Sequence, residues 1–158
     1  MDFNLSEQEL MIQTRARDFA NKLVMPRAAE IDRTGEWPFD LVSEMAKFGF
    51  FGLQLPIEYE GVGAGYKYYV LAVEQISQAS MAVAAIVAID ALGEEAIYRY
   101  GNEEQKRKFL KPLAKGEHTA MFAFTEAATG TDPRAITTTA HLEGDHYILN
   151  GDKTFSSL

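Results

Sequence analysis

The sequence predicts a mainly α-helical protein, with a helical bundle over residues 1–115 followed by a short antiparallel β segment over residues 116–158. Between residues 7 and 112, apolar residues recur at helical spacing, and capping residues, glycines or prolines stand at the segment ends. From residue 119 onward the pattern changes to short alternating runs separated by turn residues, which is typical of strands.

The composition is that of a globular protein, with 47% hydrophobic and 24% charged residues in a chain of 158. A net charge of −8 without any basic run argues against nucleic-acid binding, and the absence of cysteine excludes disulfides and thiolate metal sites. The longest apolar run, Met81 to Ile89, is too short to span a membrane, and the start lacks the features of a signal peptide. We therefore expect a cytoplasmic protein.

A capping box opens the first predicted helix, because Ser6 can cap the chain and Glu9 stands at the third helical position. Pro26 disfavours a helical conformation in the residue before it, so this helix is expected to end at about Val24 or Met25. A brief turn or helix is predicted over residues 27–32, and helices over residues 39–48, 66–78, 81–100 and 102–112. Gly49 is expected to end the first of these helices, Asn102 with Gln105 to cap the start of the last, and Pro112 to mark its end.

The connection from Gly49 to Gly65 is rich in glycine and aromatic residues. A glycine cluster can cradle a phosphate, but the strand-to-helix pattern that this needs is missing, so we interpret the segment as a surface loop. The helix over residues 81–100 is apolar nearly all round in its first half, which predicts burial, and we interpret Glu94 and Glu95 as its solvated face.

The β segment is predicted to form strands over residues 119–125, 136–142, 146–149 and 153–157. Glu143-Gly144-Asp145 is expected to form one turn, and Asn150-Gly151 a two-residue hairpin turn.

One stretch of this segment, from Phe122 to Asp132, combines features of a binding site. Phe122 and Phe124 lie two residues apart, so in a strand they share one face and can pack against a planar ring. Thr125 and Thr131 add hydroxyl groups, and the small residues between them leave the backbone accessible to an anion. Taken alone the pattern is weak, because an ordinary strand-to-loop connection has the same composition.

Four blocks of the sequence resemble the acyl-CoA dehydrogenase family. The stretch Thr119–Asp132 is similar to the family's flavin-binding signature, F-A-L-T-E-P-G-A-G-S-D, with Ala127-Ala128-Thr129 in place of Pro-Gly-Ala and Thr131 in place of serine. The three other blocks, which resemble the family's opening, its G-T-E-E-Q-K segment and its Y-x-L-N-G-x-K hairpin, are Met1–Glu7, Tyr100–Glu117 and Tyr147–Phe155.

The resemblance implies the N-terminal helical domain and the beginning of the middle β domain of an FAD-dependent oxidoreductase of fatty acid metabolism. Such an enzyme oxidises the Cα–Cβ bond of an acyl-CoA thioester. By motif, Phe122, Phe124 and Thr125 would line the flavin ring, and Thr131 would contact the FAD pyrophosphate and the substrate. Phe155 and Ser157 match the family's second flavin-contacting block.

The resemblance also implies partners: a homo-oligomer, which in the family is a tetramer, or a companion C-terminal chain, and an electron-transfer flavoprotein. The sequence stops inside a predicted strand, so we expect a truncated protein, inactive by itself, that holds FAD weakly or not at all. No residue is assigned as the catalytic base, and Glu126 is interpreted as a structural or solvated strand-end residue. A non-catalytic helical interaction module and a related flavin oxidase or monooxygenase remain the alternatives.

Overall fold

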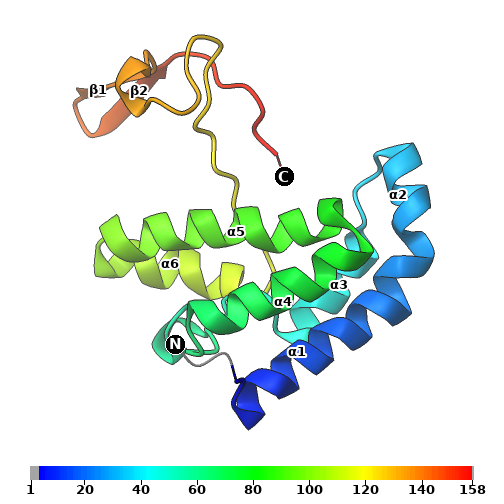
Figure 1. Cartoon of the computed structure of the whole chain (residues 1–158). Helices are drawn as coiled ribbons and strands as arrows, with labels where there is room; N and C mark the ends of the chain where they lie inside the picture. The colour runs from blue at the N-terminus through cyan, green and yellow to red at the C-terminus, as the bar shows by residue number, and fades with distance from the viewer. Residues whose placement is uncertain (1–3, 158) are drawn as a thin grey trace. The chain divides into compact units, whose positions relative to one another are not determined.

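A computed structural model describes residues 4–157 of the chain, which divides into two compact units, one ending at Ala120 and one beginning at Met121. Figure 1 shows the helices of the first unit and the hairpin of the second. The predicted fold class, mainly α with a short antiparallel β segment, is confirmed. The boundary placed after residue 115 stays a prediction. The first of the four family blocks begins at residues 1–3, which lie outside the described residues.

Six α-helices form the described part of the first unit: α1 (Glu7–Phe19), α2 (Ala28–Thr34), α3 (Phe39–Phe48), α4 (Tyr66–Ala79), α5 (Met81–Tyr100) and α6 (Glu103–Ala114). Both predicted capping pairs are confirmed. The Ser6 hydroxyl accepts a hydrogen bond from the Glu9 N–H at 3.3 Å, and the Glu9 carboxylate accepts one from the Ser6 N–H at 2.7 Å. Asn102 and Gln105 make the same reciprocal pair at the start of α6, with both distances 2.9 Å.

The helical stretch that begins at Glu7 ends at Val24, within the expected bounds, but the residue before Pro26 does not leave the helical conformation as was expected. After α1 the chain continues through a π-helical turn (Ala20–Val24) and a 3₁₀ turn (Met25–Arg27) directly into α2. Met25 keeps a right-handed helical conformation, with φ −52° and ψ −43°. Pro26 is tolerated because it lies in the first turn of a new helical segment, where its missing N–H costs no intrahelical hydrogen bond.

The end predicted for α6 also needs correction. The helix continues beyond Pro112 to Ala114, so the proline lies inside its last turn. The chain then leaves the helix through Gly116, whose φ is +65°. A Cβ atom at Gly116 would approach the Ala46 Cβ and the Phe51 ring to 2.7 Å, so glycine is required here for packing as well as for conformation.

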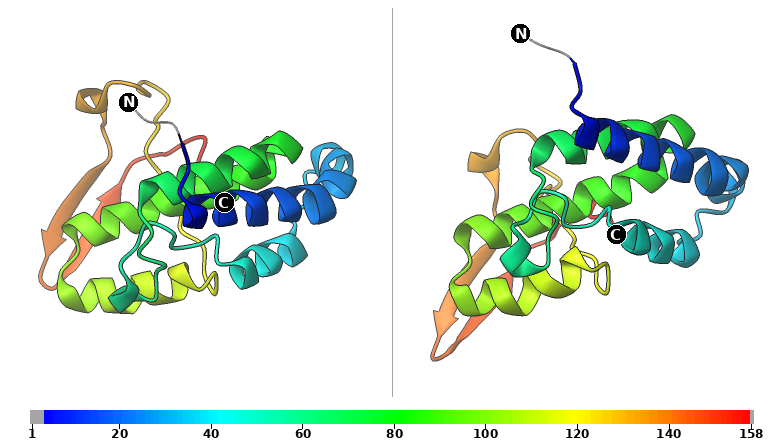
Figure 2. Two further views of the ribbon diagram at one scale, coloured as in Figure 1. Left: turned by 60° about the horizontal axis from the view of Figure 1, so that its bottom comes forward. Right: turned by 90° about the horizontal axis from the view of Figure 1, so that it is seen from below.

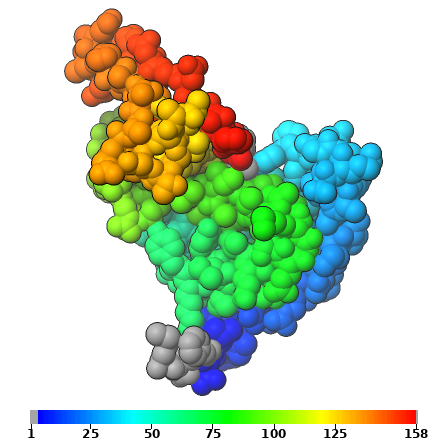
Figure 3. All heavy atoms as spheres, turned by 45° about the horizontal axis from the view of Figure 1, so that its top comes forward, coloured from blue at the N-terminus to red at the C-terminus, as the bar shows by residue number. Residues whose placement is uncertain are grey.

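Within the first unit, α1 packs on α4, α4 packs on α5, and α5 packs on α6 (Figure 2). In the space-filling view the blue, cyan and green segments form one closely packed body (Figure 3). Three phenylalanine rings meet inside it, since Phe19 lies 5.3 Å from both Phe48 and Phe50 between ring centroids. The predicted burial of α5 is confirmed on the side that carries Val83, Val87 and Ala91.

The segment between α3 and α4 is not the surface loop that was predicted. Phe50, Phe51, Leu53 and Leu55 are all at most 2% exposed. Its backbone groups are satisfied within the segment, because the N–H groups of residues 55, 62, 63 and 64 bond carbonyls of residues 52, 52, 55 and 53. The glycines do not mark exposure here; they let the backbone pack closely, as at Gly52 against Ala114.

The second unit contains one antiparallel hairpin, β1 (Thr139–Glu143) with β2 (His146–Asn150). Glu143 pairs with His146, so the predicted turn is confirmed and its two central residues are Gly144 and Asp145. Every residue of both strands is exposed.

Three predictions for this unit are wrong. Residues 119–125 and 153–157 form no strands among the described residues, and Asn150-Gly151 makes no hairpin turn, because β2 runs to Asn150 without a strand after it. A single backbone hydrogen bond, from the Thr154 N–H to the Thr125 carbonyl at 2.9 Å, joins the two segments. One bond is too few for a ladder, so the segments are neighbours without being regular strands.

Candidate functional site

The two phenylalanines of the predicted flavin site lie together. The rings of Phe122 and Phe124 are stacked, with centroids 5.6 Å apart and planes 9° from parallel. Phe122 is 44% exposed, and Phe124 is partly buried. The pair therefore presents a flat apolar surface to the surroundings, of the kind that packs against a planar ring.

The segment that carries these rings is bound to the second predicted flavin segment. Thr125 accepts the Thr154 N–H through its carbonyl, and the Lys153 ammonium donates to the Phe124 carbonyl at 3.0 Å. Two stretches nearly thirty residues apart are thus brought side by side by contacts to the backbone of Phe124 and Thr125. Sequence patterns did not indicate a role for Lys153.

Glu126 holds this part of the second unit together. One of its carboxylate oxygens accepts the N–H and the hydroxyl of Thr137, both at 2.7 Å, and the other accepts the Thr138 N–H and the Lys153 ammonium, both at 2.9 Å. Hydrogen bonds from Thr138, Thr137 and Lys153 hold the pKa of Glu126 well below its usual range. The residue is 5% exposed, so the structural interpretation of Glu126 fits its surroundings.

The loop after Glu126 is a tight turn closed by two hydrogen bonds, in which the N–H groups of Glu126 and Thr129 each donate to the other's carbonyl. The Thr129 hydroxyl donates to the Asp132 carbonyl, and the Asp132 carboxylate pairs with Arg134 through both oxygens. These groups are occupied within the loop. Thr131 lies between them in the sequence and is exposed.

Phe155 and Ser157 stand apart from the stacked rings. Phe155 is 88% exposed, has a φ of +54°, and makes no ring contact with another aromatic residue between residues 4 and 157. Ser157 is exposed. The structure therefore brings together Phe122, Phe124 and Thr125, and leaves Thr131, Phe155 and Ser157 open to solvent.

The first unit contains a polar cluster that the sequence interpretation missed. Glu94, interpreted as part of a solvated face, is 1% exposed, and so is Asp90, which lies one turn earlier on α5. The interpretation was wrong because both acids fall on the stripe of α5 that also carries Val83, Val87 and Ala91. Their spacing of four residues on that stripe was the available signal.

Each of the two acids receives one hydrogen bond from a non-helical segment. Asp90 accepts the Ala120 N–H at 2.5 Å, and Glu94 accepts from the Gln54 side-chain amide at 2.5 Å. Burial raises the pKa of Asp90 to about 7, against the effect of the Ala120 hydrogen bond. Burial and then the neighbouring Asp90 charge raise the pKa of Glu94 to about 8.

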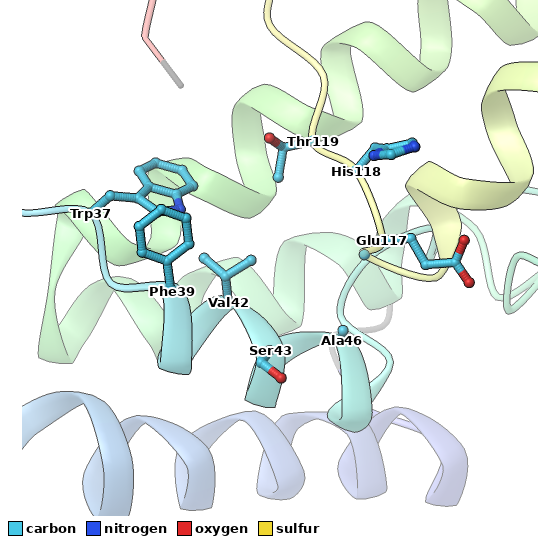
Figure 4. A pocket seen from close by; sticks show the side chains of 9 residues that line it. Trp37, Phe39, Val42, Ser43, Ala46, Glu117, His118 and Thr119 are labelled. Atoms are coloured by element: carbon cyan, nitrogen blue, oxygen red, sulfur yellow. The ribbon is translucent and has the colours of Figure 1, made fainter.

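The first unit also has an open cavity of about 590 Å³ beside the N-terminal half of α3 (Figure 4). Trp37 and Phe39 meet edge to face on one side of it, with ring centroids 6.5 Å apart, and Glu117 and His118 lie opposite. None of the six predicted flavin residues lines this cavity. Between residues 4 and 157, no group of three or more acidic or histidine side chains could hold a metal ion, and no helix has the length and apolar character to cross a membrane.

Comparison with known proteins places these features in a family. Residues 6–117 match the family described as acyl-CoA dehydrogenase, N-terminal domain. The chain is 46% identical over 95% of its length to a 3-(aryl)acrylate reductase of Clostridium sporogenes, and 42% identical over 98% to a short-chain specific acyl-CoA dehydrogenase of Clostridium acetobutylicum. It spans about 40% of the length of these curated relatives.

Solved structures agree with the sequence relatives. Butyryl-CoA dehydrogenase from Megasphaera elsdenii superposes with a TM-score of 0.92 at 34% identity, covering 99% of this chain and 42% of that one. A chain in a structure described as the electron transferring flavoprotein of Acidaminococcus fermentans gives 0.94 at 42% identity, with 99% and 41% covered. An acyl-CoA dehydrogenase complexed with FAD from Bacillus anthracis gives 0.85 at 34% identity, with 95% and 26% covered.

The fold is thus that of the N-terminal helical domain of these proteins, continued by a short antiparallel segment. The chain belongs to the acyl-CoA dehydrogenase family.

Proposed function

We propose that this chain is the N-terminal portion of an FAD-dependent acyl-CoA dehydrogenase, which introduces a double bond between Cα and Cβ of an acyl-CoA thioester. Family membership supports the reaction class. The observation that carries the proposal for this chain is the stacked, solvent-facing pair Phe122 and Phe124 beside Thr125, since a planar cofactor ring needs a flat apolar surface with a polar group at its edge.

The residues of the second unit suit FAD. Phe122 and Phe124 offer the apolar surface, and the Thr125 hydroxyl offers a hydrogen bond at its edge. Thr131 offers an exposed hydroxyl for the pyrophosphate and for the thioester ligand, while Phe155 and Ser157 supply further contacts that are open in this chain. FAD, when bound, accepts the hydride that leaves the β-carbon.

Glu126 supports this site without taking part in proton removal. Its carboxylate accepts four hydrogen bonds and its pKa is held low, so it is a weak general base. Through Lys153, which bonds both the Glu126 carboxylate and the Phe124 carbonyl, it fixes the backbone that carries the two rings. We assign Glu126 and Lys153 as positioning residues.

The wider proposal includes a cytoplasmic enzyme that assembles as a homo-oligomer or with a companion chain and passes electrons to an electron-transferring flavoprotein. Two comparisons support the electron partner. One similar solved chain is in a structure described as an electron transferring flavoprotein. The caffeyl-CoA reductase-Etf complex subunit CarC of Acetobacterium woodii is 39% identical to this chain.

A second candidate function is reduction of the same Cα–Cβ bond. The relative at 46% identity is a 3-(aryl)acrylate reductase, and another at 40% is an acryloyl-CoA reductase (NADH). Dehydrogenation and reduction use the same bond in opposite directions, so the flavin site proposed here serves both. The reduction potential of the bound flavin, measured with and without acyl-CoA, separates the two directions.

FAD titration followed by flavin fluorescence tests the site. Thr125→Val removes one hydrogen bond and is expected to weaken FAD binding roughly two- to tenfold, which corresponds to about 0.5–1.5 kcal/mol. Phe124→Ala weakens it as well by removing half of the stacked pair. Thr139→Val, at an exposed threonine of β1, is the matched control and leaves binding unchanged.

Acyl-CoA-dependent reduction of an electron-acceptor dye tests the activity, and this chain by itself is expected to give no turnover, whereas a longer protein that includes the remaining domains is expected to be active. Thr131→Val is expected to lower the affinity for FAD or acyl-CoA. Equal FAD affinity, flavin potential and acyl-CoA affinity in wild type, Thr125→Val and Thr131→Val would contradict the assignment of these residues.

A further inference from the structure

The two buried acids of α5, Asp90 and Glu94, accept hydrogen bonds from two separate segments of the helical unit. Asp90 holds the segment that leaves the unit, residues 117–120, through the Ala120 N–H. Glu94 holds the segment between α3 and α4 through the Gln54 amide. Gly93 lies between the two acids, and a Cβ there would come within 2.4 Å of the Ala120 Cβ, so the exit segment packs directly on this turn of α5.

Each acid uses only one of its oxygens in this way. Asp90 Oδ2 and Glu94 Oε1 are buried and have no hydrogen-bond partner. A buried ionised oxygen without a donor is costly, because it has lost its hydration and gained nothing in return. Two such oxygens one helical turn apart would also repel each other if both side chains were ionised.

No basic group within the described residues compensates this pair. The cations of the surrounding helices are engaged elsewhere, in the pairs Lys67–Glu9, Arg99–Glu95, Lys106–Glu103, Lys111–Glu60 and Arg17–Gln75. On the exit segment Glu117 and His118 are both exposed to solvent, which screens their charges.

We propose that Asp90 and Glu94, each buried with one unpartnered oxygen, are protonated in the folded unit and form a pH-dependent latch that holds the exit segment and the Gln54 segment against α5. A proton on each carboxyl removes the charge that burial disfavours. Loss of these protons leaves buried charges one helical turn apart, which favours release of the segments that cover them.

The latch also fixes the start of the proposed flavin segment, and this consequence depends on the proposed function. Ala120 is two residues before Phe122, so the Asp90 hydrogen bond holds the last residue of the helical unit before the stacked rings in the sequence. Asp90 and Glu94 are therefore positioning residues, which act through the backbone of the exit segment.

The direction of the pH dependence follows from the raised pKa values. Both groups bind a proton more tightly in the folded than in the unfolded chain, so their stabilisation is fully present below the unfolded pKa values, about 4. It is lost as the pH rises through about 7 for Asp90 and about 8 for Glu94.

The first experiment follows the thermal midpoint of the chain, without FAD, from pH 5 to pH 9. The midpoint of wild type is expected to fall over this range. In D90N/E94Q, whose amides keep the acceptors for Ala120 and Gln54 but do not titrate, the fall is lost. E95Q, which removes a neighbouring carboxylate paired with Arg99, keeps the wild-type fall and serves as the control.

The second experiment measures hydrogen exchange at the Ala120 amide of wild type, so it needs no variant that folds. After correction for intrinsic rates, protection is expected to fall by roughly tenfold per pH unit between about pH 5 and pH 7 for opening linked to one proton, and to level off above about pH 8. An unchanged fall of the midpoint in D90N/E94Q, or Ala120 protection independent of pH, would overturn the latch. Neither result bears on FAD binding, so failure of the latch is separate from failure of the proposed function.

Discussion

Glu94 in the helical unit and Glu126 in the second unit are both buried, at 1% and 5% exposure. Glu94 receives one hydrogen bond and its pKa is raised to about 8 by burial, whereas Glu126 receives four and its pKa is held well below the usual range. The pKa of the same side chain is therefore shifted in opposite directions. Burial dominates for Glu94, which receives one donor, and the four donors dominate for Glu126.

The two units also differ in what stabilises them. The helical unit buries phenylalanine and leucine side chains completely, as at Phe19, Phe50 and Leu53. In the hairpin of the second unit Leu142, Tyr147 and Leu149 are each more than 60% exposed, and the buried residues Glu126 and Thr129 are polar. Apolar packing therefore stabilises the first unit, and hydrogen bonds to Glu126 organise the second.

Truncation of a core ring is expected to give the largest effect. Phe50→Ala removes a ring that contacts Phe19 and Phe48, and should lower the free energy of unfolding of the helical unit by about 3–5 kcal/mol. The matched change in the hairpin, Leu149→Ala, should cost less than about 0.5 kcal/mol, because Leu149 is 70% exposed. Urea denaturation measures both losses in the free energy of unfolding. Similar losses in the two variants would contradict the conclusion that apolar packing stabilises only the helical unit.

The second-largest effect on stability is expected at a glycine that permits close backbone packing. A Cβ at Gly61 would lie 2.2 Å from the Leu55 carbonyl oxygen, so Gly61→Ala should destabilise the helical unit by about 1–3 kcal/mol. At Gly130 of the second unit a Cβ meets no atom within 4 Å, so Gly130→Ala is the control and should be close to neutral. Thermal denaturation of both variants gives the comparison, and a neutral Gly61→Ala would show that the segment between α3 and α4 is not closely packed.

The smallest effect is expected at a helix cap. Ser6→Ala removes the hydroxyl that accepts the Glu9 N–H and should cost about 1 kcal/mol in urea denaturation. Ser6→Asn keeps an acceptor at this position and should stay near wild type. A full loss in the asparagine variant would mean that the cap contributes through something other than this hydrogen bond.

Local signals predicted much of the helical unit. Ser6 with Glu9, Asn102 with Gln105, and Gly49 marked helix ends, because caps and left-handed glycines act within a few residues. The segment between α3 and α4 was misjudged because its burial depends on contacts such as Gly52 with Ala114, which are distant in sequence. Pro26 was misjudged because a proline in the first turn of a helical segment loses no intrahelical hydrogen bond, whereas the continuation of α6 beyond Pro112 has no structural explanation.

The candidate site was less accessible to sequence reasoning. The spacing of Phe122 and Phe124 indicated one shared surface, and the rings do stack. The link from Lys153 to Glu126 spans 27 residues and has no local signal. The burial of Glu94 could have been inferred from its place on the stripe with Asp90 and Val87, but charged residues are so often exposed that the opposite expectation prevailed.

Carbon-13 NMR of the side-chain carboxyls, recorded from pH 3 to pH 9 on the full chain, tests the comparison most directly. Glu94 is expected to remain protonated at pH 6 and to titrate near pH 8, while Glu126 remains ionised at pH 4. Assignment by Glu94→Gln and Glu126→Gln identifies the two resonances. Titration of both carboxyls near the ordinary glutamate value of about 4.3 would contradict the account of both units.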